Sequence, residues 1–209
     1  SDLKIGGSAR TIFTDPFVDL SLNIALNLSE LGDTLSLEQA LTGTVTGGLT
    51  AKGPLENPEA ALSFQHSGGK LAGCETKRID LKILLNNKKV RLDPLYVEFE
   101  SGNLKMEGES DLGEVFPEGF LSPPKSFDSL SYDLKLVADK VRLKSFIGED
   151  FANKVANKGQ LNGEISLEGK GISPERAFAH FQMDISGKRV SAGDFEPIDI
   201  SVESVAYLD

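Results

Sequence analysis

The residue types that most often carry chemistry are few in this 209-residue chain and lie far from one another. His66 and His180 are its only histidines, and neither has a Cys, Asp or Glu at the spacing of a metal site. Cys74 is the only cysteine, so no intrachain disulfide can form, and its neighbour Glu75 gives no sign of an activated thiol. These residues predict neither a metal centre nor a nucleophile.

The other candidates for chemistry have simpler explanations. The glycine pairs at 47–48 and 68–69 lack the following Lys and Ser/Thr of a phosphate-binding loop. Glu107, Glu109 and Asp111 alternate with other residues, which is typical of a solvated strand face and not of a catalytic carboxylate pair. We therefore expect a protein that is not an enzyme and that holds no cofactor.

Composition narrows the partners further. The chain carries 32 acidic and 22 basic residues, for a net charge of −10, which argues against a nucleic-acid partner. No run of apolar residues is long enough for a membrane-spanning helix, and no signal peptide is present. The first residues, 3–7, already resemble a strand, and residues 198–205 resemble another. We therefore expect a segment of a longer protein, with any anchor outside it.

Hydrophobic residues alternate with polar ones along most of the chain, which predicts strands with one apolar and one polar face. Leu20, Leu22 and Ile24, for example, alternate with Ser21 and Asn23. About eleven such strands follow one another, with turns predicted at 57–58, 67–69, 86–87, 101–103 and 186–188. The pattern predicts a mostly β fold built on an antiparallel sheet with one covered face.

A stretch of the sequence recurs at an offset of 116 residues. Six identities carry the repeat: Gly43, Gly47, Gly53, Pro58, Glu59 and Ala61 return as Gly159, Gly163, Gly169, Pro174, Glu175 and Ala177. Short amphipathic helices are expected just before each copy, near 36–42 and near 145–157. The proline-rich stretch 114–129 separates a first β unit, residues 1–113, from a second, residues 130–209. Such a period indicates a stacked or extended architecture.

The helix followed by a glycine ladder resembles the repeats of the TamB/AsmA-like family. The resemblance rests on Gly43, Gly47 and Gly53 with Asn57-Pro58 and the run 68–73, and on the second copy of this pattern at 159–174. It covers nearly the whole chain. It implies an elongated, curved antiparallel sheet folded lengthwise into a taco-like trough. It also implies a periplasmic location in an inner-membrane-anchored protein of the bacterial envelope, a role in phospholipid transport and outer-membrane biogenesis, and no catalytic motif.

From the residues themselves, the apolar strand faces could line a groove for phospholipid acyl chains. Residues of the alternating apolar positions are the candidates for this lipid groove: Leu20, Leu22, Ile24, Val45, Leu49, Leu62, Phe64, Ile79, Leu81, Ile83, Val97, Phe99, Leu134, Leu136, Leu161, Ile165, Leu167, Phe181, Ile198 and Ile200. Burial of each methylene of an acyl chain is worth about 0.8 kcal/mol, so a groove needs no polar contact to hold one.

Two alternatives use the same pattern. In one, the segment is a scaffold or chaperone whose sheet edges pair with nascent outer-membrane proteins, or with an outer-membrane barrel partner, by β-augmentation. In the other, two sheets close on each other as a β-sandwich and the chain is a structural spacer. The sequence does not choose between one continuous sheet and two hinged domains.

Overall fold

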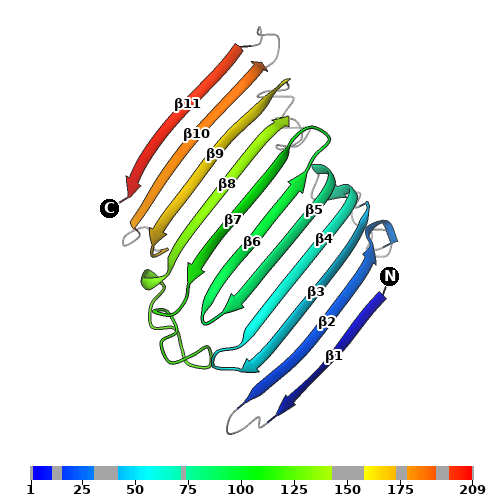
Figure 1. The fold of residues 1–209 in the computed structure, drawn as a ribbon, viewed down its shortest axis with the longest axis vertical. Coiled ribbons are helices and arrows are strands. Elements are labelled where there is room, and N and C mark those ends of the chain that lie inside the picture. Colours follow the sequence, from blue (N-terminus) through cyan, green and yellow to red (C-terminus); the bar gives the residue numbers. More distant parts are fainter. Residues whose placement is uncertain are drawn as a thin grey trace.

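The structure of the chain, a computed structural model, describes residues 2–10, 16–30, 42–71, 74–142, 158–172, 178–191 and 198–208. Within these ranges the chain forms one antiparallel sheet of eleven strands, which follow one another across the sheet in chain order (Figure 1). The first and last strands, β1 and β11, are the two edges. The mostly β, antiparallel fold expected from the alternation is confirmed.

The bounds of the elements are β1 (Asp2–Arg10), β2 (Phe17–Asn27), β3 (Thr44–Pro54), β4 (Glu59–Leu71), β5 (Cys74–Asn86), β6 (Lys89–Glu98), β7 (Asn103–Asp111), the 3-10 helix η1 (Phe127–Ser129), β8 (Ser131–Arg142), β9 (Lys158–Lys170), β10 (Phe178–Ser191) and β11 (Ile198–Leu208). Residues 28–30 are also helical. The amphipathic helices expected near 36–42 and near 145–157 lie outside the described residues, apart from Thr42, which is not helical.

Strand pairing arranges the alternating hydrophobic residues in rows that cross the sheet. One row consists of Ile5, Leu22, Leu49, Leu62, Ile83, Leu92, Gly108, Leu134, Leu167 and Phe181. Paired residues in antiparallel strands project to the same side of the sheet, so each row lies on one face. We call this side, defined by that row, the apolar face, and the opposite side the polar face.

The turns agree with the sequence at three of the five predicted places. Asn87 and Lys88 have φ values of 49° and 60° and join β5 to β6 as a two-residue hairpin. Turns also occur at 55–57 and at 100–102. The predictions at 67–69 and 186–188 are wrong, because these residues continue β4 and β10. Gly68 and Gly69 have positive φ values. Glycine tolerates this conformation, so β4 is irregular at these two residues but does not end there.

A β-bulge in β6 keeps its hydrophobic residues on one face. Ile83 pairs with Leu92 and Asp80 with Tyr96, so residues 93–95 of β6 face only residues 81–82 of β5. The extra residue restores Leu95 to the apolar face, although Leu92 and Leu95 differ in parity. Pro94 lies inside this bulge, where a missing backbone N–H breaks no regular ladder bond.

The stretch 114–129 is packed against the sheet, and the strands on either side of it pair directly. β7 and β8 are in register from Asn103 opposite Asp139 to Asp111 opposite Ser131, so the sheet runs unbroken from one unit to the other. The ring of Phe116 lies 5.1 Å from that of Phe120, measured between centroids, and the N–H of Phe120 donates to the carbonyl of Glu56 at 2.9 Å. Figure 1 shows this segment at one end of the strands, beside the turn between β3 and β4.

The internal repeat is visible in the topology. Gly47 and Gly163 occupy matching places in β3 and β9, and the strands around them, β2 to β5, correspond to β8 to β11. The second copy of the proline turn, Pro174 with Glu175 and Ala177, lies outside the described residues.

The described strands form one layer. Every extensive contact between described elements joins strands that are neighbours in the sheet, so no second sheet is packed on the apolar face. The two-layer β-sandwich considered from the sequence is therefore not formed by these strands. Within the described ranges, no helix has both the length and the apolar content needed to cross a membrane.

Candidate functional site: the apolar face

The residues predicted to line a lipid groove share one face of the sheet. Those of β2 to β10 in the set occupy its alternating inward positions, and Phe99 lies just beyond β6, buried at 4% exposure. Ile198 and Ile200 are in register with Val190 and Gly187 on this face, but their side chains are outside the described part of the chain. Whether these residues hold lipid stays a prediction.

Much of this face is open. Leu62, in the middle of β4, is 39% exposed, and Leu3 and Ile5 on β1 are 59% and 69% exposed. Leucine and isoleucine side chains inside a two-layer protein would be almost fully covered. The apolar face is therefore exposed at these positions, whereas Val45 and Val141 on the same face are buried.

Sequence reasoning missed several members of this face. Leu92, Leu95, Leu104, Met106, Ile185 and Val202 continue its rows but were not among the candidates. Their alternation was visible in the sequence. The β6 bulge was not visible there, and it is this bulge that places Leu92 and Leu95 on the same face.

Glycines interrupt the rows where neighbouring strands come closest. A Cβ placed on Gly108 would lie 2.4 Å from the carbonyl oxygen of Asp133, and one on Gly163 would lie 2.7 Å from that of Asp184. Both would project on the apolar face, where the neighbouring backbone leaves no room for a side chain. Glycine relieves the crowding, as it does at the corners of strongly curved sheets.

One hollow of the apolar face has Gly47 as its floor. Gly47 lies in register between Ile24 of β2 and Phe64 of β4. Because glycine has no side chain, the hollow of about 180 Å³ is bounded by the hydrocarbon side chains of Leu22, Ile24, Leu49, Leu62, Phe64 and Leu81. We call it the Gly47 hollow.

A second hollow has Gly163 as its floor. Gly163 lies in register between Ala138 of β8 and Ile185 of β10. Hydrocarbon side chains again surround a space, here of about 110 Å³: Leu104, Leu136, Ala138, Val141, Leu161, Ile165 and Ile185. We call it the Gly163 hollow.

His66 is a polar side chain on this face, and it is fully buried. Its Nε2 lies 3.0 Å from the carbonyl oxygen of Thr42, and its Nδ1 lies 3.2 Å from Oγ1 of Thr76. Since a carbonyl only accepts, Nε2 donates to Thr42, and in the neutral ring Nδ1 accepts from the Thr76 hydroxyl. Both ring nitrogens therefore have hydrogen-bond partners.

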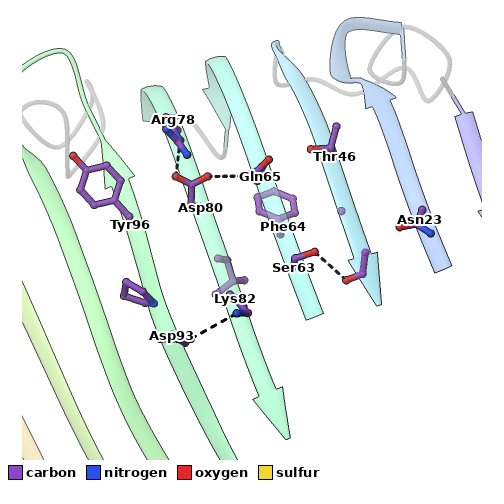
Figure 2. Close-up of a pocket in the computed structure, with 14 residues that line it drawn as sticks. Asn23, Thr46, Ser63, Phe64, Gln65, Arg78, Asp80, Lys82, Asp93 and Tyr96 are labelled. Atoms are coloured by element: carbon purple, nitrogen blue, oxygen red, sulfur yellow. Dashed lines mark hydrogen bonds and ion pairs between the residues drawn. The ribbon is translucent and has the colours of Figure 1, made fainter. Parts of the chain in front are cut away.

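The polar face carries ion pairs. A hollow of about 670 Å³ lies on it across β2 to β6, and Figure 2 shows residues that line it, among them Asn23, Thr46, Gln65 and Tyr96. Its charged groups pair with one another: Arg78 with Asp80, and Lys82 with Asp93 at 3.8 Å. Exposed pairs of this kind contribute little to stability.

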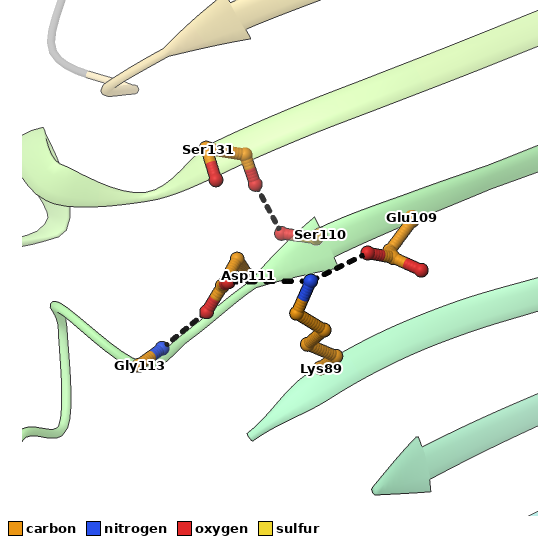
Figure 3. A network of polar contacts seen from close by, with 6 residues as sticks. All are labelled: Lys89, Glu109, Ser110, Asp111, Gly113 and Ser131. Carbon is orange, nitrogen blue, oxygen red and sulfur yellow. Dashed lines mark hydrogen bonds and ion pairs between the residues drawn. The ribbon is translucent and has the colours of Figure 1, made fainter. Parts of the chain in front are cut away.

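Two lysines of the polar face have shifted titration. Lys89 Nζ lies 3.1 Å from Glu109 Oε1 and 3.7 Å from Asp111 Oδ2 (Figure 3). The hydrogen bond to Glu109, and then the charges of Glu109 and Asp111, raise the pKa of Lys89 above its ordinary 10.5. The hydrogen bond to Glu164, at 2.6 Å, likewise raises the pKa of Lys135. Both carboxylate–lysine groups are solvent-exposed.

The acidic positions noted in the sequence are thus explained by ion pairing. Glu109 and Asp111 pair with Lys89, and Glu107 pairs with Lys105 at 2.7 Å. Among the described residues, no three His, Cys, Asp or Glu side chains are placed to hold a metal ion. His180 faces Glu168 in register, on the polar face, and so is not equivalent to His66.

Comparison with known proteins finds no similar protein or structure. No protein-family model matches the chain, and searches of curated proteins and of solved structures find no match either. The resemblance to the TamB/AsmA-like family therefore stays a prediction that rests on the sequence pattern.

Proposed function

We propose that the apolar face is a groove that carries the acyl chains of phospholipids. The observation that carries the proposal is the asymmetry of the sheet: rows of hydrocarbon side chains cross every strand on one side, and ion pairs such as Lys89–Glu109 cover the other. An apolar face that the described strands leave without a second layer is unfavourable in water and favours an apolar occupant.

The dimensions suit an elongated groove. Eleven strands at a spacing of about 4.8 Å extend roughly 50 Å across the sheet. The crowding at Gly108 and Gly163 supports a sheet that curls toward its apolar face, as a lengthwise-folded trough would. Acyl chains would slide along this trough while their headgroups stay in water, and no covalent step is involved.

The wider setting follows from the family resemblance and belongs to the same proposal. The chain would be a segment of an inner-membrane-anchored protein in the bacterial periplasm that moves phospholipid between the two membranes and so contributes to outer-membrane biogenesis. The net charge of −10 agrees with a groove that holds tails by burial and not by attraction of anionic headgroups.

The test compares two leucines on the same strand that face opposite sides. Leu81 of β5 contributes to the Gly47 hollow, whereas Leu84 lies on the polar face beside Thr50 and Lys52. We expect Leu81→Asp to lower crosslinking of a photoreactive phospholipid clearly and Leu84→Asp to leave it intact, with both variants retaining a β-type circular-dichroism spectrum. Equal crosslinking by the two variants would contradict the proposal.

A second function is favoured by the edges of the sheet. Within the described strands, β1 and β11 each pair on one side only, so each presents an unpaired row of backbone groups. Such an edge can receive a strand of a nascent outer-membrane protein by β-augmentation. Binding of this kind would depend on the peptide backbone and would be unaffected by Leu81→Asp, which separates it from lipid capture.

A further inference from the structure

The two hollows of the apolar face are copies of one feature. Each is floored by a glycine of the 116-residue repeat, and each glycine has one neighbour from the preceding strand and one from the following strand. Ile24 and Phe64 take these places beside Gly47, and Ala138 and Ile185 take them beside Gly163. The repeat therefore reproduces a cavity as well as a sequence pattern.

The two hollows are separated on the apolar face. The side chains that bound the Gly47 hollow lie on β2 to β5, and those that bound the Gly163 hollow lie on β7 to β10. Leu95 and Val97 of β6 lie on the apolar face between the two groups, opposite Met106 and Leu104 of β7. Strand β6 thus lies between the two hollows.

We infer that the Gly47 and Gly163 hollows are two separate stations for the hydrocarbon chains of phospholipids, six strands apart and with β6 between them. At about 4.8 Å per strand the stations lie about 29 Å from each other. This inference rests on the proposed function. It adds that lipid tails are held at discrete, repeated places and are passed between them, in contrast to a uniform groove.

The lining selects the occupant. Both hollows are lined by hydrocarbon side chains, apart from Ser63 at the Gly47 hollow and Asn162 at the Gly163 hollow. Both of these belong by strand parity to the polar face, where Ser63 donates to the carbonyl of Gly48 and Asn162 accepts from the N–H of Lys140. A peptide strand lying in either hollow would bury N–H and C=O groups without side-chain partners, at a substantial cost. An alkyl chain has no such groups, so the tail of a phospholipid fits and a peptide does not.

The experiment exploits the absence of tryptophan from the chain. Single tryptophans at Phe64→Trp and Ile185→Trp report on the two stations, and Tyr96→Trp on the polar face is the matched aromatic control. The probe is a long-chain fatty acid brominated at mid-chain, which quenches tryptophan fluorescence on contact. We expect saturable quenching of Phe64→Trp and Ile185→Trp and none of Tyr96→Trp.

Substitutions that fill one station test whether the two are independent. In the Phe64→Trp background, Gly47→Ala places about one methylene in the hollow and is expected to raise the half-quenching concentration about fourfold. Gly48→Ala is its control, because the added methyl points to the polar face and meets the side-chain oxygens of Asn23 and Ser63 at 3.3 Å. In the Ile185→Trp background, Ala138→Leu adds three carbons and is expected to raise that concentration more than about tenfold.

Each filling substitution should leave the other station unchanged. The inference is overturned if Gly47→Ala or Ala138→Leu weakens quenching at both stations equally, or if Leu95→Trp, on β6 between the two hollows, is quenched as strongly as either. Those results would indicate a uniform groove and leave the proposed function standing. Quenching at neither station would overturn the proposed function as well. Ala138→Val replaces Ala138→Leu if the larger variant loses cooperative unfolding.

Discussion

The imidazole of His66 and the hydroxyl of Thr76 form a hydrogen bond at one end of the apolar face, with 3.2 Å between Nδ1 and Oγ1. The other ring nitrogen donates to the carbonyl of Thr42, so the ring joins β4 to β5 and to the residues that lead into β3. Gly43 packs so closely here that a Cβ would lie 2.7 Å from His66 Nε2. His66 therefore links β4, β5 and the residues that precede β3 at one end of the apolar face.

This arrangement predicts a stability effect at Thr76. Thr76→Val keeps the shape of the side chain but leaves Nδ1 of a fully buried ring without its donor. We expect the free energy of unfolding, measured by urea titration, to fall by about 1–3 kcal/mol. Thr50→Val, at an exposed position of the polar face, is the control and should change it by less than about 0.5 kcal/mol. Similar losses for the two variants would show that the hydrogen bond is not stabilising.

The glycines of the apolar face yield a second prediction. Gly108→Ala would bring a methyl group within 2.4 Å of the Asp133 carbonyl, whereas a methyl group at Gly6 meets nothing within 4 Å. Overpacking of this kind costs about 1–3 kcal/mol, and alanine at an open site gains a few tenths through the unfolded chain.

Thermal unfolding of the two variants measures the difference. The midpoint of Gly108→Ala should fall clearly below that of the parent protein, and the midpoint of Gly6→Ala should equal or slightly exceed it. A Gly108→Ala protein as stable as Gly6→Ala would mean that the strands beside β7 relax enough to admit the added methyl group.

The sequence was sufficient for the strands and their faces, because a period of two is a local property. Leu20, Leu22 and Ile24 reveal their common side without knowledge of any partner strand. The two hollows could not be predicted from the sequence. Gly47 and Gly163 were recognised as repeated, but that they form cavity floors depends on which residues of the neighbouring strands lie beside them.

The failures of prediction have a similar cause. The Gly-rich stretches at 67–69 and 186–188 have the composition of turns, yet strand pairing continues through both. Glycine permits a turn without requiring one, and the long partners β5 and β11 provide backbone groups for the continued ladder. The burial of His66 was equally invisible, since it depends on Thr42 and Thr76, which lie 24 and 10 residues away.

The ion pairs of Lys89 predict a dependence of stability on pH. The pKa of Lys89 is raised in the folded protein above 10.5 by Glu109 and Asp111. A raised lysine pKa contributes stability that is complete below pH 10.5 and is lost as the pH rises through the folded pKa. Lys89→Met should therefore unfold at a slightly lower urea concentration than the parent protein at neutral pH, and the difference should vanish in strongly alkaline solution.

Because Lys89 and Glu109 are exposed, the expected change in the urea midpoint is small and should depend on salt. Salt screens exposed pairs, so the neutral-pH difference should shrink in high salt. Glu109→Gln in the Lys89→Met background should add less than it does alone, because the pair is then already broken. A difference that persists unchanged at high pH would assign the effect of Lys89→Met to packing.

The direct pairing of β7 with β8 predicts that the chain survives a cut between its two units. Nine residue pairs join these strands, from Asn103–Asp139 to Asp111–Ser131, and apolar rows continue across them through Met106 opposite Leu136. A protease site inserted beside the exposed Lys125 would open the connecting segment without removing any of these pairs. After cleavage, we expect the two fragments to elute together in size-exclusion chromatography and to separate only in denaturant. Uncut protein treated in parallel is the control, and spontaneous separation would instead show that residues 1–113 and 130–209 fold as independent domains.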